Sequence, residues 1–442
     1  YSGAKLRNTA SNDDVNDFFR TGATFNNSIS VSGGTETVRT YFSYANSYSD
    51  GMMRNNNYKR NTLSFRQSYS LFNKKLNVDL SLNYVQAKTK NRPGGGTVMN
   101  PLYDLYRMPR NVDLNYYKEN YYIENGKWTS NEQSYFDSKN NKWTTGTVEL
   151  TGPKQEWAYW QNGMNNPYWM VNTRNSISEE ERAYGYISAN YQIIDGLKIQ
   201  GRLSLDRTKM KGTSERMATT WNISAMEDYG MYGQDLNWIN EVYVDALLSY
   251  DKQIKDFSIS ATTGWTGHTL KGETQKLWAK ATTANWKHDT MPTLINFFEP
   301  SVSQGNVSER SYTLSSNWDK GLLFTGQIGW QEKVYLEGSY RRDWYRAFKQ
   351  YSYRGTPTNY GYFSVGANAL LHQIVTLPEV ITNLKVRASY SEVGNSIPNV
   401  LYNARNTDPL TGAAVPSSYS YFNNPIPEKT KSFEAGFDIS LF

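Results

Sequence analysis

The chain has 442 residues, of which 38% are hydrophobic and 15% aromatic, and it contains no cysteine, so disulfides and thiolate metal sites are excluded. Its 47 basic and 41 acidic residues leave a net charge of only +6, which does not indicate a dedicated nucleic-acid-binding protein. No apolar run in the sequence approaches the roughly 20 residues that a membrane-spanning helix needs.

Apolar and polar residues alternate with a period of two in many places, which predicts β-strands. In LKIQGRLSLDRTKM (197–210), the odd-numbered positions are mostly apolar and the even-numbered positions mostly polar. The predicted strands, in chain order, are 23–33, 37–48, 59–71, 76–88, 183–194, 197–210, 238–251, 256–267, 321–331, 333–344, 361–374, 383–393 and 429–442. Strands of about 10–14 residues suit a tilted membrane crossing with an overhang.

The connections between these strands alternate between short and long. The short ones are 33–36, 73–75, 195–196, 252–255, 331–332 and 377–383, and the long ones are 49–58, 89–182, 211–237, 268–320, 345–360 and 394–428. Outer-membrane barrels place short turns at the periplasmic rim and long loops outside the cell. The sequence therefore predicts an all-β fold, a transmembrane antiparallel up-and-down β-barrel with long extracellular loops.

This fold assigns a face to each residue of 197–206. The lipid-facing set is Leu197, Ile199, Leu203 and Leu205, and the set facing the lumen is Lys198, Gln200, Arg202 and Asp206. The reverse assignment would place Lys198 and Arg202 in hydrocarbon, at a cost of about 2–4 kcal/mol each near the midplane. Closed bacterial barrels usually have an even number of strands, so thirteen predicted strands indicate a portion of a larger barrel or a count that is wrong by one.

Several segments resemble one family. FFRTGATFNNSISVSGGTETVRTYFSYANSYSDGMMRNNNYKRNTLSFR (18–66) resembles the early barrel strands of SusC/RagA-type TonB-dependent transporters of the outer membrane of Bacteroidetes-type bacteria. FTGQIGWQEKVYLEGSYRRD (324–343), LKVRASYSEVGN (384–395) and PEKTKSFEAGFDISLF (427–442) resemble later strands in the family's order. NPYW (166–169) lies where such proteins often carry a similar motif before a strand.

The resemblance implies a 22-stranded barrel with an N-terminal plug, energised by the TonB-ExbB-ExbD complex and covered by a SusD-like surface lipoprotein. The cargo would be an oligosaccharide or a peptide. Residues 1–442 would then be a portion of the barrel, because neither the plug nor the last strands are in the chain. Its opening YSGAKLRNTASNDD has no Met and no apolar signal segment, so we expect processing or truncation upstream. RDWYRAF (342–348) replaces the RDGSSRF often seen in the family, so the ligand class is not carried over.

The sequence contains no pattern that indicates catalysis. Its three histidines, His268, His288 and His372, share no metal-ligand spacing, and no HExxH, GxSxG or P-loop motif occurs. We expect a protein without enzymatic activity, cofactor or metal. RPGGGT (92–97) is interpreted as a flexible loop and not a phosphate cradle. SISEEER (176–182) is interpreted as a solvated turn, with a short capped helix as the alternative.

Aromatic residues are concentrated in the loop 143–169. The candidate ligand-binding residues there are Trp157, Tyr159, Trp160, Tyr168 and Trp169. Stacking on sugar rings or peptide side chains is one role for them, and packing within the loop or against a partner is the alternative that we favour. A second group is interpreted as an interfacial belt and consists of Trp344, Tyr345, Phe348, Tyr351 and Tyr353.

The leading prediction is therefore active import across the bacterial outer membrane. One alternative is a soluble or surface β-rich module that binds glycans or has a structural role. Another is a passive porin. A plug upstream of residue 1 would distinguish a gated transporter from a porin.

Overall fold

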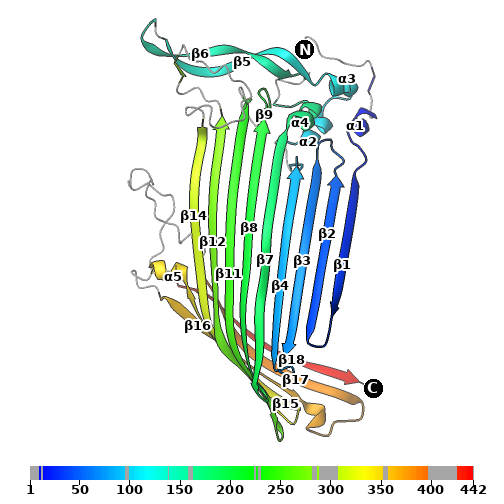
Figure 1. The fold of residues 1–442 in the computed structure, drawn as a ribbon, viewed down its shortest axis with the longest axis vertical. Helices are drawn as coiled ribbons and strands as arrows, with labels where there is room; N and C mark the ends of the chain where they lie inside the picture. The colour runs from blue at the N-terminus through cyan, green and yellow to red at the C-terminus, as the bar shows by residue number, and fades with distance from the viewer. Residues whose placement is uncertain are drawn as a thin grey trace.

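A computed structural model of the protein is dominated by one curved antiparallel β-sheet (Figure 1). It describes residues 9–10, 13–94, 99–137, 139–157, 163–222, 225–226, 230–280, 286–287, 307–351, 357–396 and 426–441. Within these ranges, no helix is both long enough and apolar enough to cross a bilayer.

The large sheet has thirteen strands, which lie side by side in the order in which they occur in the chain, and each is antiparallel to its neighbours. They are β1 (Ala23–Gly34), β2 (Val38–Asp50), β3 (Asn57–Leu71), β4 (Leu76–Lys90), β7 (Asn175–Ile194), β8 (Leu197–Arg216), β11 (Met231–Ile254), β12 (Phe257–Lys280), β14 (Val307–Trp330), β15 (Val334–Tyr345), β16 (Asn359–Leu370), β17 (Ile381–Asn395) and β18 (Glu428–Leu441). Every predicted strand coincides with one of them, so the predicted number of strands and the up-and-down order are confirmed.

All short connections lie at one end of the sheet, which we call the turn end. Residues 72–75 join β3 to β4, and three of them, Phe72, Asn73 and Lys74, have positive φ angles of 51°, 54° and 67°. The β7–β8 turn contains Gly196 at φ 82°, where a Cβ atom would lie 2.6 Å from the carbonyl oxygen of Asp251. These tight turns bring successive strands back antiparallel and leave the long connections at the other end, the loop end (Figure 1).

Five strands are much longer than predicted. β7 and β8 have 20 residues, and β11, β12 and β14 have 24. A strand of 24 residues extends about 80 Å, whereas a tilted crossing needs about 9–11 residues. The wall therefore continues well beyond the thickness of a bilayer.

The interpretation of 176–182 as a solvated turn was wrong, because this segment belongs to β7. Its backbone pairs with β4 on one side and with β8 on the other, for example Glu179 with Lys88 and Lys211. Lys88 Nζ lies 2.7 Å from Glu179 Oε1. Because lysines on both neighbouring strands face the acidic run, it is stable in an extended conformation.

The alternation of faces follows the prediction. Leu203 and Leu205 on β8 are exposed on the outward face, while the alternate residues Arg202 and Ser204 are half-buried on the inward face. Pairing extends this order across the sheet, since Leu203 lies beside Ile187 and Val244. The result is an apolar outward face and a polar inward face.

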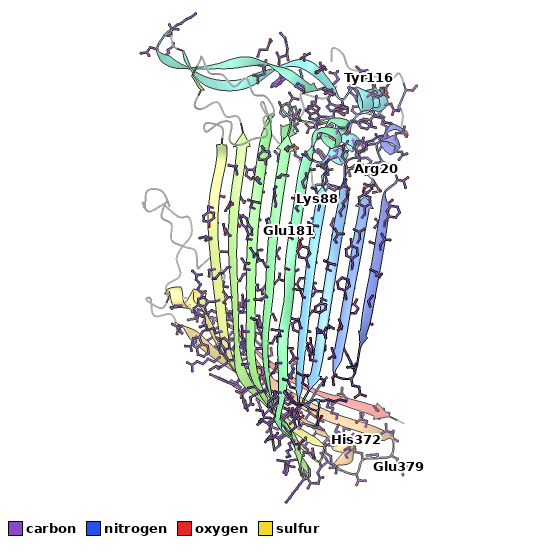
Figure 2. All side chains as sticks on the ribbon, viewed as in Figure 1. Arg20, Lys88, Tyr116, Glu181, His372 and Glu379 are labelled. Atoms are coloured by element: carbon purple, nitrogen blue, oxygen red, sulfur yellow. The ribbon has the colours of Figure 1, made fainter. Side chains whose placement is uncertain are left out.

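Smaller elements gather at the loop end, as Figure 1 shows for most of them. They are α1 (Asp13–Asp17), α2 (Pro101–Arg107), α3 (Leu114–Glu119), α4 (Pro167–Thr173), α5 (Arg346–Tyr351) and the short strands β5 (Tyr122–Asp137), β6 (Lys142–Gln155), β9 (Trp221–Asn222), β10 (Ala225–Met226) and β13 (Trp286–Lys287). A single turn of 3₁₀ helix, η6 (Leu371–Gln373), lies between β16 and β17. Figure 2 shows His372 and Glu379 at the turn end, far from the labelled Tyr116 of α3 at the loop end.

The sheet is curved like a segment of barrel wall, with β15–β18 inclined to the long strands (Figure 1). Within the described ranges it has two edges, because β1 pairs only with β2 and β18 only with β17.

Candidate functional site

A row of polar side chains crosses the inward face near the middle of the sheet. The ladder pairs Arg202 with Asp245, Asp245 with Thr266, Thr266 with Gly321 and Gly321 with Asp343. Arg202 Nε donates to Asp245 Oδ2 at 2.7 Å. The Asp245 carboxylate is almost completely buried, although it lies on the open face of a sheet. The Asp245 carboxylate is therefore held in place by Arg202 and shielded from water by the surrounding side chains.

Asp343 is the second buried carboxylate of this row. It accepts from Arg341 Nε at 2.9 Å and from the Tyr362 hydroxyl at 2.7 Å. Arg341 Nη2 also donates to Thr266 Oγ1 at 3.3 Å, across β14. This crossing requires Gly321, because a Cβ atom there would lie 2.6 Å from both Arg341 Nη2 and Asp343 Oδ1.

Nearer the loop end, His268 lies between two carboxylates on the same face. Its Nδ1 is 2.8 Å from Asp319 Oδ1, and its Nε2 is 2.8 Å from Glu241 Oε1. Three neighbouring strands thus contribute to one charged contact. In the part of the chain that the structure describes, no group of three or more His, Cys, Asp or Glu side chains is arranged to hold a metal ion. The inward face is therefore an array of ion pairs and hydrogen bonds that suits a polar solute or a polar protein surface.

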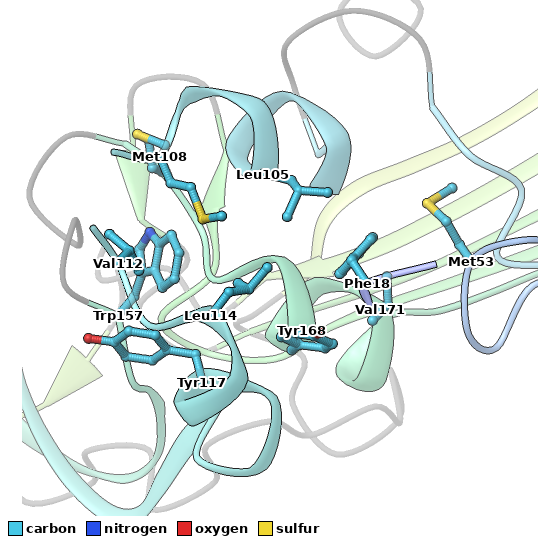
Figure 3. Packing of buried hydrophobic residues seen from close by; sticks show 11 residues of the cluster. Phe18, Met53, Leu105, Met108, Val112, Leu114, Tyr117, Trp157, Tyr168 and Val171 are labelled. Carbon is cyan, nitrogen blue, oxygen red and sulfur yellow. The ribbon is translucent and has the colours of Figure 1, made fainter. Parts of the chain in front are cut away.

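The loop end is covered by a layer with its own hydrophobic core (Figure 3). Its buried residues come from distant parts of the chain and are Phe18, Met53, Leu105, Met108, Val112, Leu114, Tyr117, Trp157, Met164, Tyr168 and Val171. The rings of Tyr117 and Trp157 meet edge to face with centroids 5.0 Å apart, and those of Phe18 and Tyr168 are 5.2 Å apart. The described part of the long connection 91–174 is therefore a packed layer.

Three of the five candidate ligand-binding aromatics lie in or beside this core. Trp157, Tyr168 and Trp169 are 5%, 0% and 1% exposed, while Tyr159 and Trp160 lie outside the described residues. Direct contact between the three buried side chains and a cargo would require the layer to open. Ligand binding by the five residues stays a prediction.

The NPYW motif begins α4 and explains part of this burial. Asn166 is the N-cap, and its Oδ1 accepts from the backbone N–H of Tyr168 at 2.8 Å, while Pro167 occupies the first turn. Both residues are favoured at these positions of a helix. The helix then directs Tyr168 and Trp169 into the layer.

A buried polar network lies beside this helix, and sequence reasoning missed it. Gln155 Nε2 donates to Asn165 Oδ1 at 3.1 Å and also to the carbonyl oxygen of Thr219. Gln155 Oε1 accepts from the backbone N–H of Asn166 at 3.0 Å. Trp169 Nε1 donates to Thr220 Oγ1 at 2.9 Å. The bonds to Thr219 and Thr220 join the connection 91–174 to the connection 217–230, and no local pattern predicts pairs that are 51–64 residues apart.

Asp104 on α2 is the buried acid of this layer. Its Oδ2 accepts from the backbone N–H of Asn165 at 3.1 Å. Burial raises the pKa of Asp104 to about 6, although this hydrogen bond and the charge of Arg107 act in the opposite direction. The carboxyl group therefore loses its proton only slightly below neutral pH.

The hairpin β5–β6 extends from the layer across the loop end (Figure 1). Lys127 and Glu149 pair across it at 2.8 Å and are largely exposed. The hairpin thus presents polar side chains to the solvent.

The second aromatic group was predicted to form an interfacial belt, and for two of its members this was wrong. Phe348 on α5 is fully buried, and Tyr345 packs against it and against Tyr360. Tyr360 pairs with Asp343 in the ladder and so belongs to the inward face. Trp344 points outward, where Arg342 lies 5.8 Å from its ring centroid, as the prediction requires. Tyr353 lies outside the described residues.

No known family profile matches the chain, and no curated protein matches its sequence. Among solved structures, the RagAB peptide transporter is similar over 100% of this chain, with a TM-score of 0.70 and 18% identity. The RagAB peptide importer in its closed-closed state has a TM-score of 0.69 and 19% identity over the same range. The ferripyoverdine receptor of the outer membrane of Pseudomonas aeruginosa has a TM-score of 0.51 and 14% identity over 95% of this chain.

In each of these three comparisons, the chain spans 45% of the length of the other protein. The similarity shows that the chain has the β-barrel fold of these outer-membrane proteins, here as an open antiparallel sheet.

Proposed function

We propose that the chain forms part of the wall of a TonB-dependent transporter that imports a polar nutrient across the bacterial outer membrane. The observation that carries this proposal is the sheet itself. It combines an apolar outward face, an inward face with buried ion pairs, short turns at one end and a packed loop layer at the other. The likeness to the RagAB peptide transporter supports the same function. The similar structures are transporters and receptors, which favours a protein without enzymatic activity.

The two edges of the sheet support a larger barrel. An edge strand in hydrocarbon leaves unpaired N–H and C=O groups, and each of them costs several kcal/mol. We propose that further strands close the barrel between β1 and β18 and that a plug fills the lumen. Residues 1–442 are then a portion of the wall, in agreement with their 45% coverage of the RagAB chain.

The proposed partners are TonB-ExbB-ExbD, acting through the plug, and a SusD-like surface lipoprotein at the loop end. The proposed cargo is a peptide or an oligosaccharide, because the charged inward row suits polar solutes of either class. Contact between cargo and the loop 143–169 is tested by the double variant Trp157→Ala/Trp160→Ala in the full-length protein. Lost uptake with an intact barrel and lipoprotein complex supports contact, and normal uptake contradicts it.

Transport is tested with the full-length protein in its parent bacterium. We expect the protein to fractionate with the outer membrane, to migrate differently on gels before and after heating, and to support uptake only when TonB is present. Uptake without TonB would identify a passive porin instead. A protein that stays in solution in detergent-free buffer would favour the soluble β-rich module.

A further inference from the structure

The outward face has a band of basic side chains at the loop end of its apolar surface. We call it the basic girdle, and its members, one on each of six strands, are Lys59, Lys88, Arg207, Lys271, Lys320 and Arg342. All six side chains are exposed. Figure 2 shows Lys88 near the loop end of the wall, with Glu181 close by.

The ladder shows that these residues point outward. Lys59 pairs with Lys88, which pairs with Glu179, which pairs with Lys211 on β8. Lys211 shares its odd-numbered face of β8 with Leu203 and Leu205, the outward apolar positions. The same counting places the other four members on this face.

The girdle follows the edge of the apolar band on most of its strands, and on β14 the exposed Leu314 and Tyr312 continue the apolar surface beyond Lys320. Arg207, Lys320 and Arg342 lie two positions beyond the exposed apolar residues Leu205, Leu322 and Tyr340 of their own strands. Lys59 and Lys88 lie four positions beyond the exposed Leu63 and Tyr84.

The pairing register of the strands indicates that all members of the basic girdle lie at the same height in the membrane. The ladder rows that contain Lys88, Lys271, Lys320 and Arg342 cross β8 at residues 211, 207, 203 and 201, in that order around the sheet. Rows of a barrel are inclined to its axis because the strands are tilted. A ring at constant height therefore meets successive strands at a steadily shifting register, which is the order observed here. The apolar edge shifts in the same direction, since the row of Tyr84 crosses β8 at 207 and that of Tyr340 at 199.

Aromatic rings hold half of these cations in place. Lys59 Nζ lies 5.3 Å from the ring centroid of Tyr48, and Lys320 Nζ lies 5.4 Å from that of Trp318. Arg342 lies over Trp344. Tyrosine and tryptophan are typical of the level of lipid headgroups, so the rings place the cations at that level.

The charge of the band is mainly positive, and it is restricted to the loop end. The outward acidic residues near the girdle include Asp50, Glu179, Glu181, Glu273 and Glu392. Three of them have a basic partner, because Asp50 is paired with Arg20, Glu179 with Lys88 and Glu392 with Lys431. Lys209 and Lys211 of β8 add two further cations on the same face. At the turn end of the strands β3 to β15, the outward positions of the described wall hold one basic residue, Lys252. It lies 3.4 Å from Asp195.

We propose that the basic girdle binds the phosphate groups of anionic lipid in the leaflet at the loop end. The inference rests on the proposed outer-membrane location. Cations at the boundary between apolar surface and water are complementary to phosphates at the boundary between acyl chains and water. A ring on six strands would hold several lipids around the wall and fix its height in the bilayer.

The test uses the full-length protein in nanodiscs of phosphatidylcholine, with or without a minor fraction of diphosphoryl lipid A. The variant is Arg207→Gln/Lys271→Gln/Lys320→Gln, and mass spectrometry measures the lipid A retained after extraction in detergent. Each cation near an anionic surface changes affinity by about fivefold, so three should lower it by about a hundredfold. Millimolar inorganic phosphate should not displace the lipid, because free phosphate lacks acyl chains.

The matched control is Lys198→Gln/Lys276→Gln/Lys385→Gln, which removes three inward charges from the same wall. It should retain lipid A as the wild type does. Equal retention by the girdle variant, or equal loss in both variants, would overturn the proposal. Outer-membrane fractionation and heat-modifiable migration of the wild type test the proposed function separately, so a correctly placed barrel that retains no lipid A contradicts the girdle alone.

Discussion

Replacing Leu203 by arginine should impair assembly of the barrel, whereas replacing its neighbour Ser204 by arginine should not. Leu203 is 38% exposed on the outward face and lies beside Ile187 and Val244. Ser204 is on the inward face, beside Tyr186 and Tyr243. One step along the strand thus moves the same charge from lipid to water.

The magnitude follows from the depth of Leu203 in the apolar band. On β8 this band runs from Leu197 to Leu205, so its midpoint is near Gly201. Two residues along a strand tilted by about 45° correspond to a rise of about 5 Å. Arginine at the midplane costs about 2–4 kcal/mol, and less toward the interface. We therefore expect about 2–3 kcal/mol for Leu203→Arg and a value near zero for Ser204→Arg.

Heat-modifiable migration of the full-length protein on gels reports the assembled fraction. A loss of 2–3 kcal/mol corresponds to about a 30- to 150-fold smaller equilibrium constant. The variant Leu203→Ala controls for loss of the leucine side chain and should assemble. Equal assembly of the two arginine variants would refute the assignment of the faces.

Three further predictions concern the loop layer and the inward row. Gln155→Leu leaves the Asn166 N–H and the Thr219 carbonyl without their partner, so it should destabilise the layer by about 2–6 kcal/mol. Limited proteolysis should then cleave the layer faster, while the heat-modifiable migration of the barrel stays normal. Unchanged cleavage would contradict a stabilising role for this hydrogen-bond network. Gly321→Leu should displace the Arg341–Asp343 pair and reduce uptake without reducing assembly, whereas wild-type uptake would show that the pair has no role in transport. The pKa of Asp104 is raised to about 6 in the folded layer, so the stability of the layer should fall as the pH rises from about 4 to about 6 and then level off, by about 3 kcal/mol in total. Asp104→Asn should abolish this dependence in hydrogen exchange measured across that range, and an unchanged profile would assign it to another group.

The sequence predicted the wall well because its strands carry a local signal. Each crossing must place apolar side chains in lipid at every second position, so stretches such as 197–206 and 76–84 reveal both the strand and its faces. The tight turns between the strands are also visible in the sequence, as short interruptions of the alternation between apolar and polar residues. The number and order of the thirteen strands follow from this one constraint.

The pattern does not extend above the membrane, where both faces of a strand contact water. The acidic run 176–182 has no alternation and forms a strand only because lysines on β4 and β8 pair with it. The loop layer depends on contacts between distant segments, such as Phe18 with Tyr168 and Gln155 with Thr219. The aromatic residues of the loop 143–169 indicate that this connection packs against something, but not which residues meet in its core.

The orientation of the wall is tested most directly by labelling single cysteines, since the chain has none of its own. The two variants are Asn131→Cys in β5 at the loop end and Asn73→Cys in the β3–β4 turn. A membrane-impermeant maleimide added to whole cells should label the cysteine at 131 and not the one at 73, and both should react after lysis. Labelling at 73 alone would reverse the orientation, and equal labelling of the two in whole cells would contradict a membrane-spanning wall.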